Sequence, residues 1–197
     1  MTVVRTISRN ASAVVMTLIM ATTVASLTPC GAVAQEHAVA PEVNPPGDIP
    51  DNQQFVTFVA KQGASLKVPE GWGRTDTAVG ALFADKYNRI ELTIQTSASA
   101  LTMESIRSGQ ALELQRTGHA VHIAKIERVR LPAGPGVRIT YTSNSEPNAV
   151  TGKKIRLENE RFYLSENGKV AELTFSAPAG ADNADQWALM SKSFRWK

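Results

Sequence analysis

The sequence predicts an α+β domain in which two helices cover an antiparallel β-sheet. Three observations lead to this class. Apolar and polar residues alternate over many short runs, as they do in half-buried strands. Turn signals separate neighbouring runs closely enough for hairpins, which pair strands antiparallel. Two longer segments, 101–118 and 182–194, change to helical spacing, and no regular strand–helix–strand rhythm is present.

The strands expected before the first helix are short and rich in β-branched and aromatic residues. The second of them ends at the turn signal Pro69-Glu70-Gly71-Trp72. The third and fourth are separated by Lys86-Tyr87-Asn88, which indicates a hairpin whose second strand turns Ile90, Leu92 and Ile94 to one face. The expected ranges are 55–59, 65–68, 79–85 and 89–96.

The first helix is expected over 101–118. Thr102 is its candidate N-cap, with Leu101 and Ile106 at the positions of a hydrophobic staple, and Gly118 suits the position after the last turn. Gly109 weakens the helix by about 1 kcal/mol relative to alanine.

Four strands are expected after this helix, at 121–131, 137–142, 154–165 and 170–176. The stretch from Pro132 to Gly136 predicts a turn after the first of them, and Asn167-Gly168 predicts a tight hairpin between the last two. The final helix, over 182–194, has Asp182 as candidate cap and an apolar stripe of Trp187, Met190 and Phe194.

The whole span from Phe55 to Trp196 resembles PsbP-like proteins and the LpqN-type lipoproteins of actinobacteria. The resemblance lies in the strand run ending at Pro69-Glu70-Gly71-Trp72, the central helix between two strand sets, and the close Leu173 to Pro178 followed by a helix ending at Trp196. It implies an antiparallel sheet sandwiched by helices and an accessory, assembly or binding role at a membrane. It implies no catalytic residues.

Residues 1–34 are predicted to be a secretory signal peptide. Arg5 and Arg9 form a positive start, residues 11–27 are apolar, and Ala32-Val33-Ala34 suits a signal peptidase that cleaves between Ala34 and Gln35. A second processing mode also fits. The segment Leu27 to Gly31 resembles a bacterial lipobox, in which Cys30 would become the acylated first residue, although Pro29 departs from the usual small residue there.

Residues 35–52 are rich in proline and acidic residues and predict a disordered or extended tether, so that 53–197 forms the folded domain. Arg5 and Arg9 belong to the leader, which leaves 19 of the 21 basic residues against 18 acidic ones. A nearly neutral domain offers no electrostatic case for nucleic acid. Its one cysteine lies in the leader, so the domain has neither a disulfide nor thiol chemistry.

No catalytic, cofactor or metal site is predicted. His119 and His122 would face opposite sides of a strand, which does not suit one metal ion. Glu158 and Glu160 alternate as solvent-facing strand residues do, and the chain has no nucleophile elbow. Trp72, Trp187 and Trp196 are interpreted as core anchors.

The predicted function is that of a non-enzymatic accessory or binding protein, secreted or periplasmic, or held at a membrane through Cys30. Its partner would be an envelope protein or a small ligand. One alternative is a carrier with an apolar pocket between helix and sheet, which requires unfilled space near Trp72 and Trp187. Another is an exported hydrolase, which requires His119 or His122 to cluster with a serine or a carboxylate.

Overall fold

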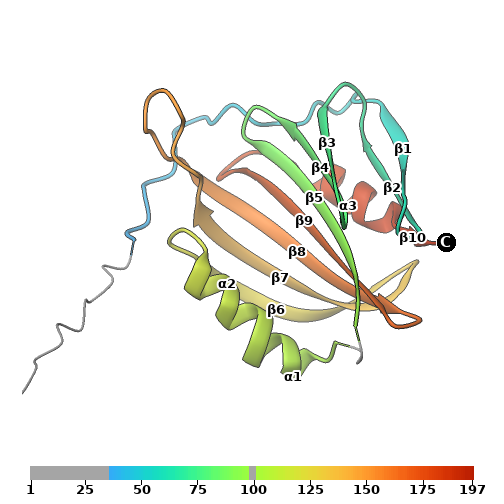
Figure 1. Cartoon of the computed structure of the whole chain (residues 1–197). Helices are drawn as coiled ribbons and strands as arrows, with labels where there is room; N and C mark the ends of the chain where they lie inside the picture. Colours follow the sequence, from blue (N-terminus) through green and yellow to red (C-terminus); the bar gives the residue numbers. More distant parts are fainter. Residues whose placement is uncertain (1–35, 98–100) are drawn as a thin grey trace, which may run out of the picture. The chain divides into compact units, whose positions relative to one another are not determined.

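A seven-stranded antiparallel sheet with the order β3-β4-β5-β9-β8-β7-β6 is the centre of the structure (Figure 1). This computed structural model describes residues 36–97 and 101–197, which belong to one compact unit. The predicted signal peptide, Cys30 and the Ala34–Gln35 cleavage position lie outside the described residues. The strands of this sheet are β3 (Gly73–Thr77), β4 (Gly80–Asp85), β5 (Asn88–Thr96), β6 (His122–Leu131), β7 (Gly134–Asn144), β8 (Arg156–Glu166) and β9 (Lys169–Pro178).

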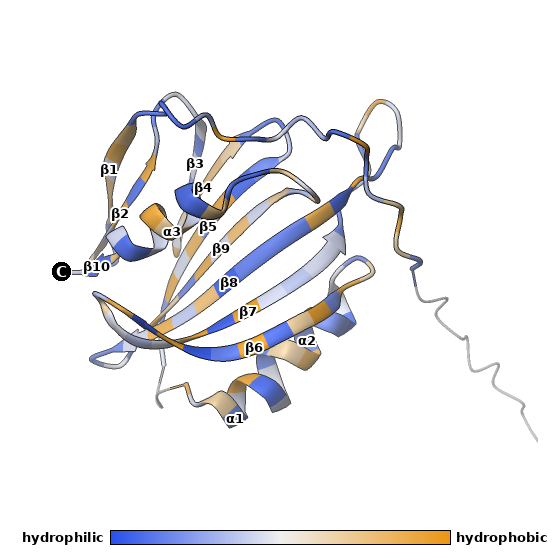
Figure 2. Cartoon of the chain, turned by 180° about the vertical axis from the view of Figure 1, so that it is seen from behind, coloured by the Kyte–Doolittle hydropathy of each residue, from blue (hydrophilic) through white to orange (hydrophobic). Residues whose placement is uncertain are grey.

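One face of this sheet packs on a second layer, and together they form the main core. The second layer combines α3 (Ala184–Ser193) with a small sheet of order β1-β2-β10, as the view from behind shows (Figure 2). Ile90, Leu92 and Ile94 line the sheet side of this core with at most 4% exposure, which confirms the predicted alternation. The strands of the small sheet are β1 (Phe55–Ala60), β2 (Ala64–Pro69) and β10 (Arg195–Trp196).

The opposite face is only partly covered. A continuous helical segment made of α1 (Met103–Ser105), the π-helical turn η1 (Ile106–Gln110) and α2 (Ala111–Thr117) lies over it. Ile106 and Leu114 of this segment pack on Val137, Ile139 and Tyr141 of β7. The predicted α+β class, with helices on both sides of an antiparallel sheet, is therefore confirmed. The small second sheet was not part of that prediction.

The first helix begins where the sequence predicts. Thr102 accepts a hydrogen bond from Ser105 N at 3.0 Å, and Ser105 Oγ accepts one from Thr102 N at 2.9 Å, which forms a capping box. At the other end Gly118 N donates to Leu114 O at 3.0 Å. Gly109 lies within the π-helical turn, so the expected weak point coincides with a local departure from α-helical geometry.

The two glycines of this helix should respond in opposite ways to alanine. A Cβ on Gly109 meets nothing within 4 Å, whereas on Gly118 it would lie 2.5 Å from Val121 Cγ2 and 2.7 Å from Leu114 O. We expect Gly109→Ala to raise the free energy of unfolding by about 1 kcal/mol. Gly118→Ala should lower it by about 1 kcal/mol, because the backbone must move. Urea unfolding of both variants tests this, and equal effects of the same sign would contradict it.

The hairpins are mostly where the turn residues predict them. Asn167 and Gly168 have φ values of 47° and 73° and join β8 to β9, which confirms that turn. The stretch from Pro132 to Gly136 differs: the turn contains only Pro132 and Ala133, and β7 starts at Gly134. The fully exposed edge strand β3 was not predicted, because its Gly, Arg, Thr and Asp residues carry no apolar pattern.

The last helix has its N-cap one residue later than predicted. Asp182 is not its N-cap; Asn183 holds that position, and its side chain makes no capping hydrogen bond. Asn183 Oδ1 instead accepts from Ile49 N at 2.6 Å, and Asn183 Nδ2 donates to Gly47 O at 2.9 Å. The physical reason is that residues 47–49, which are distant in sequence, take the hydrogen bonds of this buried amide, so it does not cap the helix.

Residues 36–52 have no helix or strand, but they lie against the domain. Ile49 is 3% exposed and belongs to the main core, while Lys153 donates to the Glu42 carboxylate. The composition predicts a disordered or extended tether; the segment is without helix or strand, and one buried isoleucine and several hydrogen bonds hold it against the domain. We refer to residues 36–49 as the strap.

Candidate functional site

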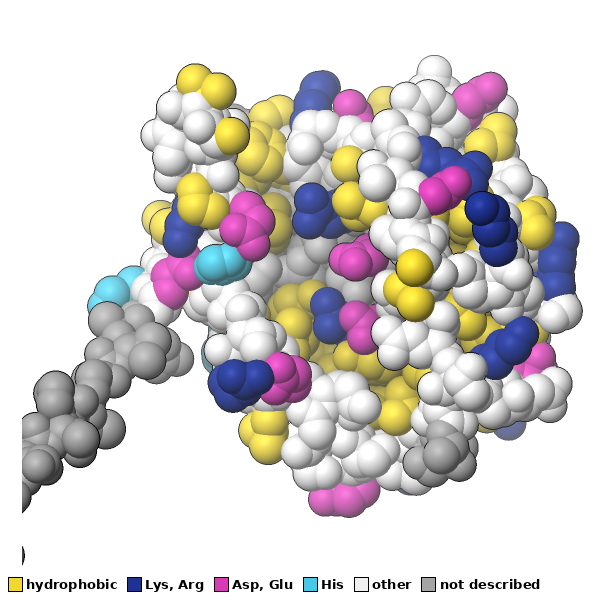
Figure 3. Space-filling view, in the orientation of Figure 1, with side chains coloured by type: hydrophobic (Ala, Val, Ile, Leu, Met, Phe, Trp, Pro, Cys, Tyr) yellow, Lys and Arg dark blue, Asp and Glu magenta, His cyan; other side chains and the backbone are white. Residues whose placement is uncertain are grey.

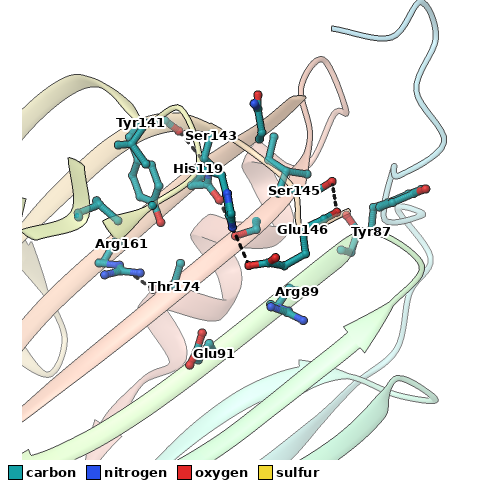
Figure 4. A pocket seen from close by; sticks show the side chains of 18 of the residues that line it. Tyr87, Arg89, Glu91, His119, Tyr141, Ser143, Ser145, Glu146, Arg161 and Thr174 are labelled. Atoms are coloured by element: carbon teal, nitrogen blue, oxygen red, sulfur yellow. Dashed lines mark hydrogen bonds and ion pairs between the residues drawn. The ribbon is translucent and has the colours of Figure 1, made fainter. Parts of the chain in front are cut away.

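The uncovered part of the second sheet face forms a hollow of about 350 Å³, which we call the sheet groove. Its floor consists of polar side chains of β8 and β9: Asn159, Arg161, Thr174 and Ser176. The space-filling view shows side chains of both charge signs gathered in this hollow (Figure 3). The rim is formed by the end of α2 with His119, by the segment from Ser143 to Glu146, and by the start of β5 (Figure 4).

Arg161 is the central charged residue of the floor. Its Nε donates to Thr174 Oγ1 at 3.0 Å, and its Nη1 lies 2.8 Å from Glu172 Oε1. The guanidinium carbon also lies 5.9 Å from the centre of the Tyr141 ring. The side chain of Arg161 is 19% exposed and lines the groove, while that of Glu172 is 32% exposed and lies outside the groove lining.

The two tyrosines beside this ion pair are strongly affected by their surroundings. Burial raises the pKa of Tyr163 to about 12, and the charge of Glu172 acts in the same direction. Burial likewise raises the pKa of Tyr141. Burial alone would lower the pKa of Arg161, but Tyr141, Glu172 and Tyr163 more than offset it and the pKa is raised. At neutral pH the groove lining therefore includes a fixed cation, Arg161, and a neutral phenol, Tyr141, while Tyr163 and Glu172 lie outside that lining.

The strap is attached to the rim of the sheet groove through Glu36. The Glu36 carboxylate accepts hydrogen bonds from Asn144 Nδ2 and Lys154 Nζ, each at 2.8 Å, and lies 2.6 Å from His119 Nδ1. The Asn144 and Lys154 hydrogen bonds are the main reasons that the pKa of Glu36 is lowered to about 2. The hydrogen bond with Glu36 also raises the pKa of His119, against the effect of burial.

Asn144 joins the strap to the sheet. The residue is 3% exposed; Nδ2 donates to His37 O at 2.8 Å, and Oδ1 accepts from Val39 N and from Arg156 Nη1, each at 3.0 Å. All the hydrogen-bonding groups of this amide are therefore used.

The two histidines named from the sequence have different surroundings. His119 lies between two carboxylates, with Nε2 3.0 Å from Glu146 Oε1, whereas His122 is exposed at the start of β6. In residues 36–97 and 101–197, no group of three or more His, Cys, Asp or Glu is placed to hold a metal ion. The hydroxyl of neighbouring Ser145 donates to Glu146 O at 2.8 Å, which is not the serine–histidine pair of a hydrolase.

The acidic residues considered from the sequence also have other partners. Glu160 lies 3.0 Å from Arg138 Nη1, and burial raises its pKa. Glu158 is exposed, and its Oε1 accepts from Gly180 N at 3.3 Å.

The tryptophans pack against the main core, as expected of core anchors. Trp72, Trp187 and Trp196 contact it, and the Trp187 ring stacks on Phe175 with centroids 5.9 Å apart. The sheet groove lies on the opposite face of the sheet and is lined mainly by polar groups. Its place and chemistry therefore differ from the apolar pocket near Trp72 and Trp187 that the carrier hypothesis requires.

Sequence reasoning did not find the groove residues, although a signal for them exists. On β9, polar residues alternate with the predicted apolar ones: Glu172, Thr174 and Ser176. On β5, Arg89 and Glu91 alternate with the apolar residues in the same way. This pattern predicts a polar second face. It does not predict that the helix covers one half of that face and leaves the other half open.

No family model and no curated protein matches the chain. Among solved structures it is similar to cyanobacterial PsbP (CyanoP) from Synechocystis sp. PCC 6803, with 15% identity and a TM-score of 0.49 over 87% of this chain and 99% of that one. A second similar structure is LpqN, involved in cell envelope biogenesis of Mycobacterium tuberculosis, with 13% identity and a TM-score of 0.45 over 74% and 91% of the two chains.

A third similar structure is PA94 from Pseudomonas aeruginosa, a putative regulator, with 9% identity and a TM-score of 0.43 over 68% and 92% of the chains. At these identities the likeness concerns the course of the chain and assigns no role to any residue. CyanoP and LpqN bear the names of the two groups that the sequence resembles.

Proposed function

We propose that the protein is an exported accessory or binding protein of the cell envelope, without catalytic activity of its own, and that it binds a small polar ligand in the sheet groove. The observation that carries this proposal is the open polar floor around Arg161. The face of a β-sheet usually either packs against another layer or is fully exposed to solvent. Here a largely buried arginine, a neutral phenol and the hydroxyl groups of Thr174 and Ser176 line a hollow of ligand size.

Export is supported by the sequence of the leader rather than by the folded domain. The helices among the described residues are too short and too polar to cross a bilayer. His119 does lie against carboxylates, as the hydrolase alternative requires, but both of its ring nitrogens face them, and this supports a protein without catalytic activity. A general base needs one nitrogen that can accept a proton from a substrate or nucleophile.

The proposal predicts that the processed protein, purified from its host, carries a small molecule. Native mass spectrometry should detect this added mass. It also determines the N-terminus, which is Gln35 after simple cleavage or an acylated Cys30 in a lipoprotein. The Ser176→Phe variant places a ring on the groove floor and should lose the ligand.

Thr75→Phe is the matched control, because it adds the same ring on the exposed strand β3, away from the groove. The proposal fails if the protein carries nothing and if a small-molecule extract of the host envelope leaves its thermal stability unchanged. It also fails if Ser176→Phe and Thr75→Phe retain equal amounts of the ligand.

A further inference from the structure

Strand β5 brings two side chains of opposite charge into the sheet groove, and neither has a hydrogen-bond or ion-pair partner among the described residues. Arg89 and Glu91 both line the groove from β5, and both are exposed. Over residues 36–97 and 101–197, neither side chain makes a hydrogen bond or an ion pair. By contrast, Arg161 is paired with Glu172. Lys86, in the turn before β5, is also exposed, lines the groove and makes no hydrogen bond or ion pair within the described part of the chain. Lys86, Arg89 and Glu91 are therefore the charges available to a ligand, and Arg89 and Glu91 are the pair of opposite sign on one strand.

The spacing of these two charges is determined by the strand. Residues i and i+2 of a strand point to the same face and are about 7 Å apart. In the sheet, Arg89 lies opposite Ser176 and Glu91 lies opposite Thr174, whose hydroxyl side chains belong to the groove floor. A ligand that contacts these hydroxyl groups therefore has a cation and an anion beside it. Figure 4 shows the side chains of Arg89, Glu91 and Thr174 around the groove.

This arrangement discriminates between classes of ligand. A simple anion would be attracted by Arg89 but repelled by Glu91, and a simple cation would meet the reverse. A neutral ligand would displace water from both charged side chains but would offer neither of them an opposite charge. The cost of desolvating the two charges would then not be compensated. A ligand with one negative and one positive group satisfies both side chains, and charge-assisted hydrogen bonds are the strongest polar contacts available.

We propose that the sheet groove binds a small zwitterion with one carboxylate and one ammonium group, in the size range from a free amino acid to a short peptide. The carboxylate pairs with Arg89 and the ammonium group pairs with Glu91. A hollow of about 350 Å³ suits a ligand of this size. This inference rests on the proposed function, because it specifies the ligand of the same groove.

The test is calorimetric titration of the processed protein with the twenty free L-amino acids and with glycylglycine. At least one of them should bind saturably. Its amide, which lacks the carboxylate, and its N-acetyl derivative, which lacks the ammonium group, should each bind about ten- to a hundredfold more weakly. Glucose, a neutral polar molecule of similar size, should not bind.

Two variants assign each charge. Arg89→Met should weaken binding of the zwitterion about ten- to a hundredfold and should remove the difference between the zwitterion and its amide. Glu91→Gln should weaken it similarly and should remove the difference between the zwitterion and its N-acetyl derivative. Lys67→Met and Glu70→Gln are matched controls, because both residues are exposed and lie outside the groove; they should leave binding unchanged.

The inference and the proposed function can fail separately. If the protein carries a ligand that Ser176→Phe releases, but binds no zwitterion or binds glucose equally well, the ligand class is wrong and the proposed function stands. If the protein neither carries a ligand nor binds any of these probes, both are wrong. A zwitterion whose affinity is unchanged in Arg89→Met and Glu91→Gln also contradicts the inference.

Discussion

Replacing Arg161 by methionine is expected to lower the free energy of unfolding by about 2–4 kcal/mol. Removing one partner of a buried ion pair leaves the other charge without compensation, which costs about 3–5 kcal/mol when the pair is fully buried. Because the side chains of Arg161 and Glu172 are 19% and 32% exposed, solvent screens part of this cost. Urea unfolding at neutral pH measures the difference.

The double variant Arg161→Met/Glu172→Met distinguishes loss of the pair from loss of packing. Two apolar side chains remove the uncompensated charge, so the double variant should be more stable than Arg161→Met alone. A double variant that is no more stable than the single one would show that the ion pair is not the cause. The pKa of Tyr163 gives a second readout: it should fall from about 12 in Glu172→Gln, as measured by ultraviolet titration of the phenol.

The strap should stabilise the protein most strongly between about pH 4.5 and 6.5. The pKa of Glu36 is lowered from 4.5 to about 2, so its contribution is present above pH 4.5 and is lost as the pH falls towards 2. The pKa of His119 is raised from 6.5, so its contribution is present below pH 6.5 and is lost as the pH rises through the folded-state pKa. Both contributions are complete only in the window between these limits.

Glu36→Gln should therefore lower the free energy of unfolding by about 1–2 kcal/mol inside this window, since the 28% exposure of the Glu36 side chain reduces the full effect of the pKa shift. The difference from the unmodified protein should shrink below pH 4.5. Asp76→Asn is the control, because Asp76 pairs with Arg74 on the exposed strand β3. A difference that is constant from about pH 3 to pH 8 would rule out this role for Glu36.

Much of the fold is predictable from local sequence. The alternation in 89–96 and 170–176 predicts which side chains enter the core, because successive strand residues point to opposite faces. The Asn167-Gly168 turn is predictable because both residues adopt positive φ readily. Thr102 is predictable as a cap because its side chain needs only residues within one helical turn.

The candidate site depends on contacts that local sequence does not contain. Asn183 looks like an ordinary polar residue near a helix start, yet its amide holds the strap, which is more than a hundred residues away in the chain. Glu36 lies in a segment whose composition predicts a disordered or extended tether and indicates no contact, yet Asn144, Lys154 and His119 hold it at the groove rim. No periodicity indicates such pairings, because they depend on which surfaces meet after folding.

The sequence by itself determined the α+β class, the hairpins, the two helices and the polar character of the second sheet face. Each of these follows from side-chain periodicity or from the backbone preferences of a few neighbouring residues. Only the tertiary structure decided that the first helix covers β7 and leaves Arg89, Glu91 and Arg161 uncovered. The position of a helix on a sheet depends on the fit of whole surfaces, and this fit creates the sheet groove.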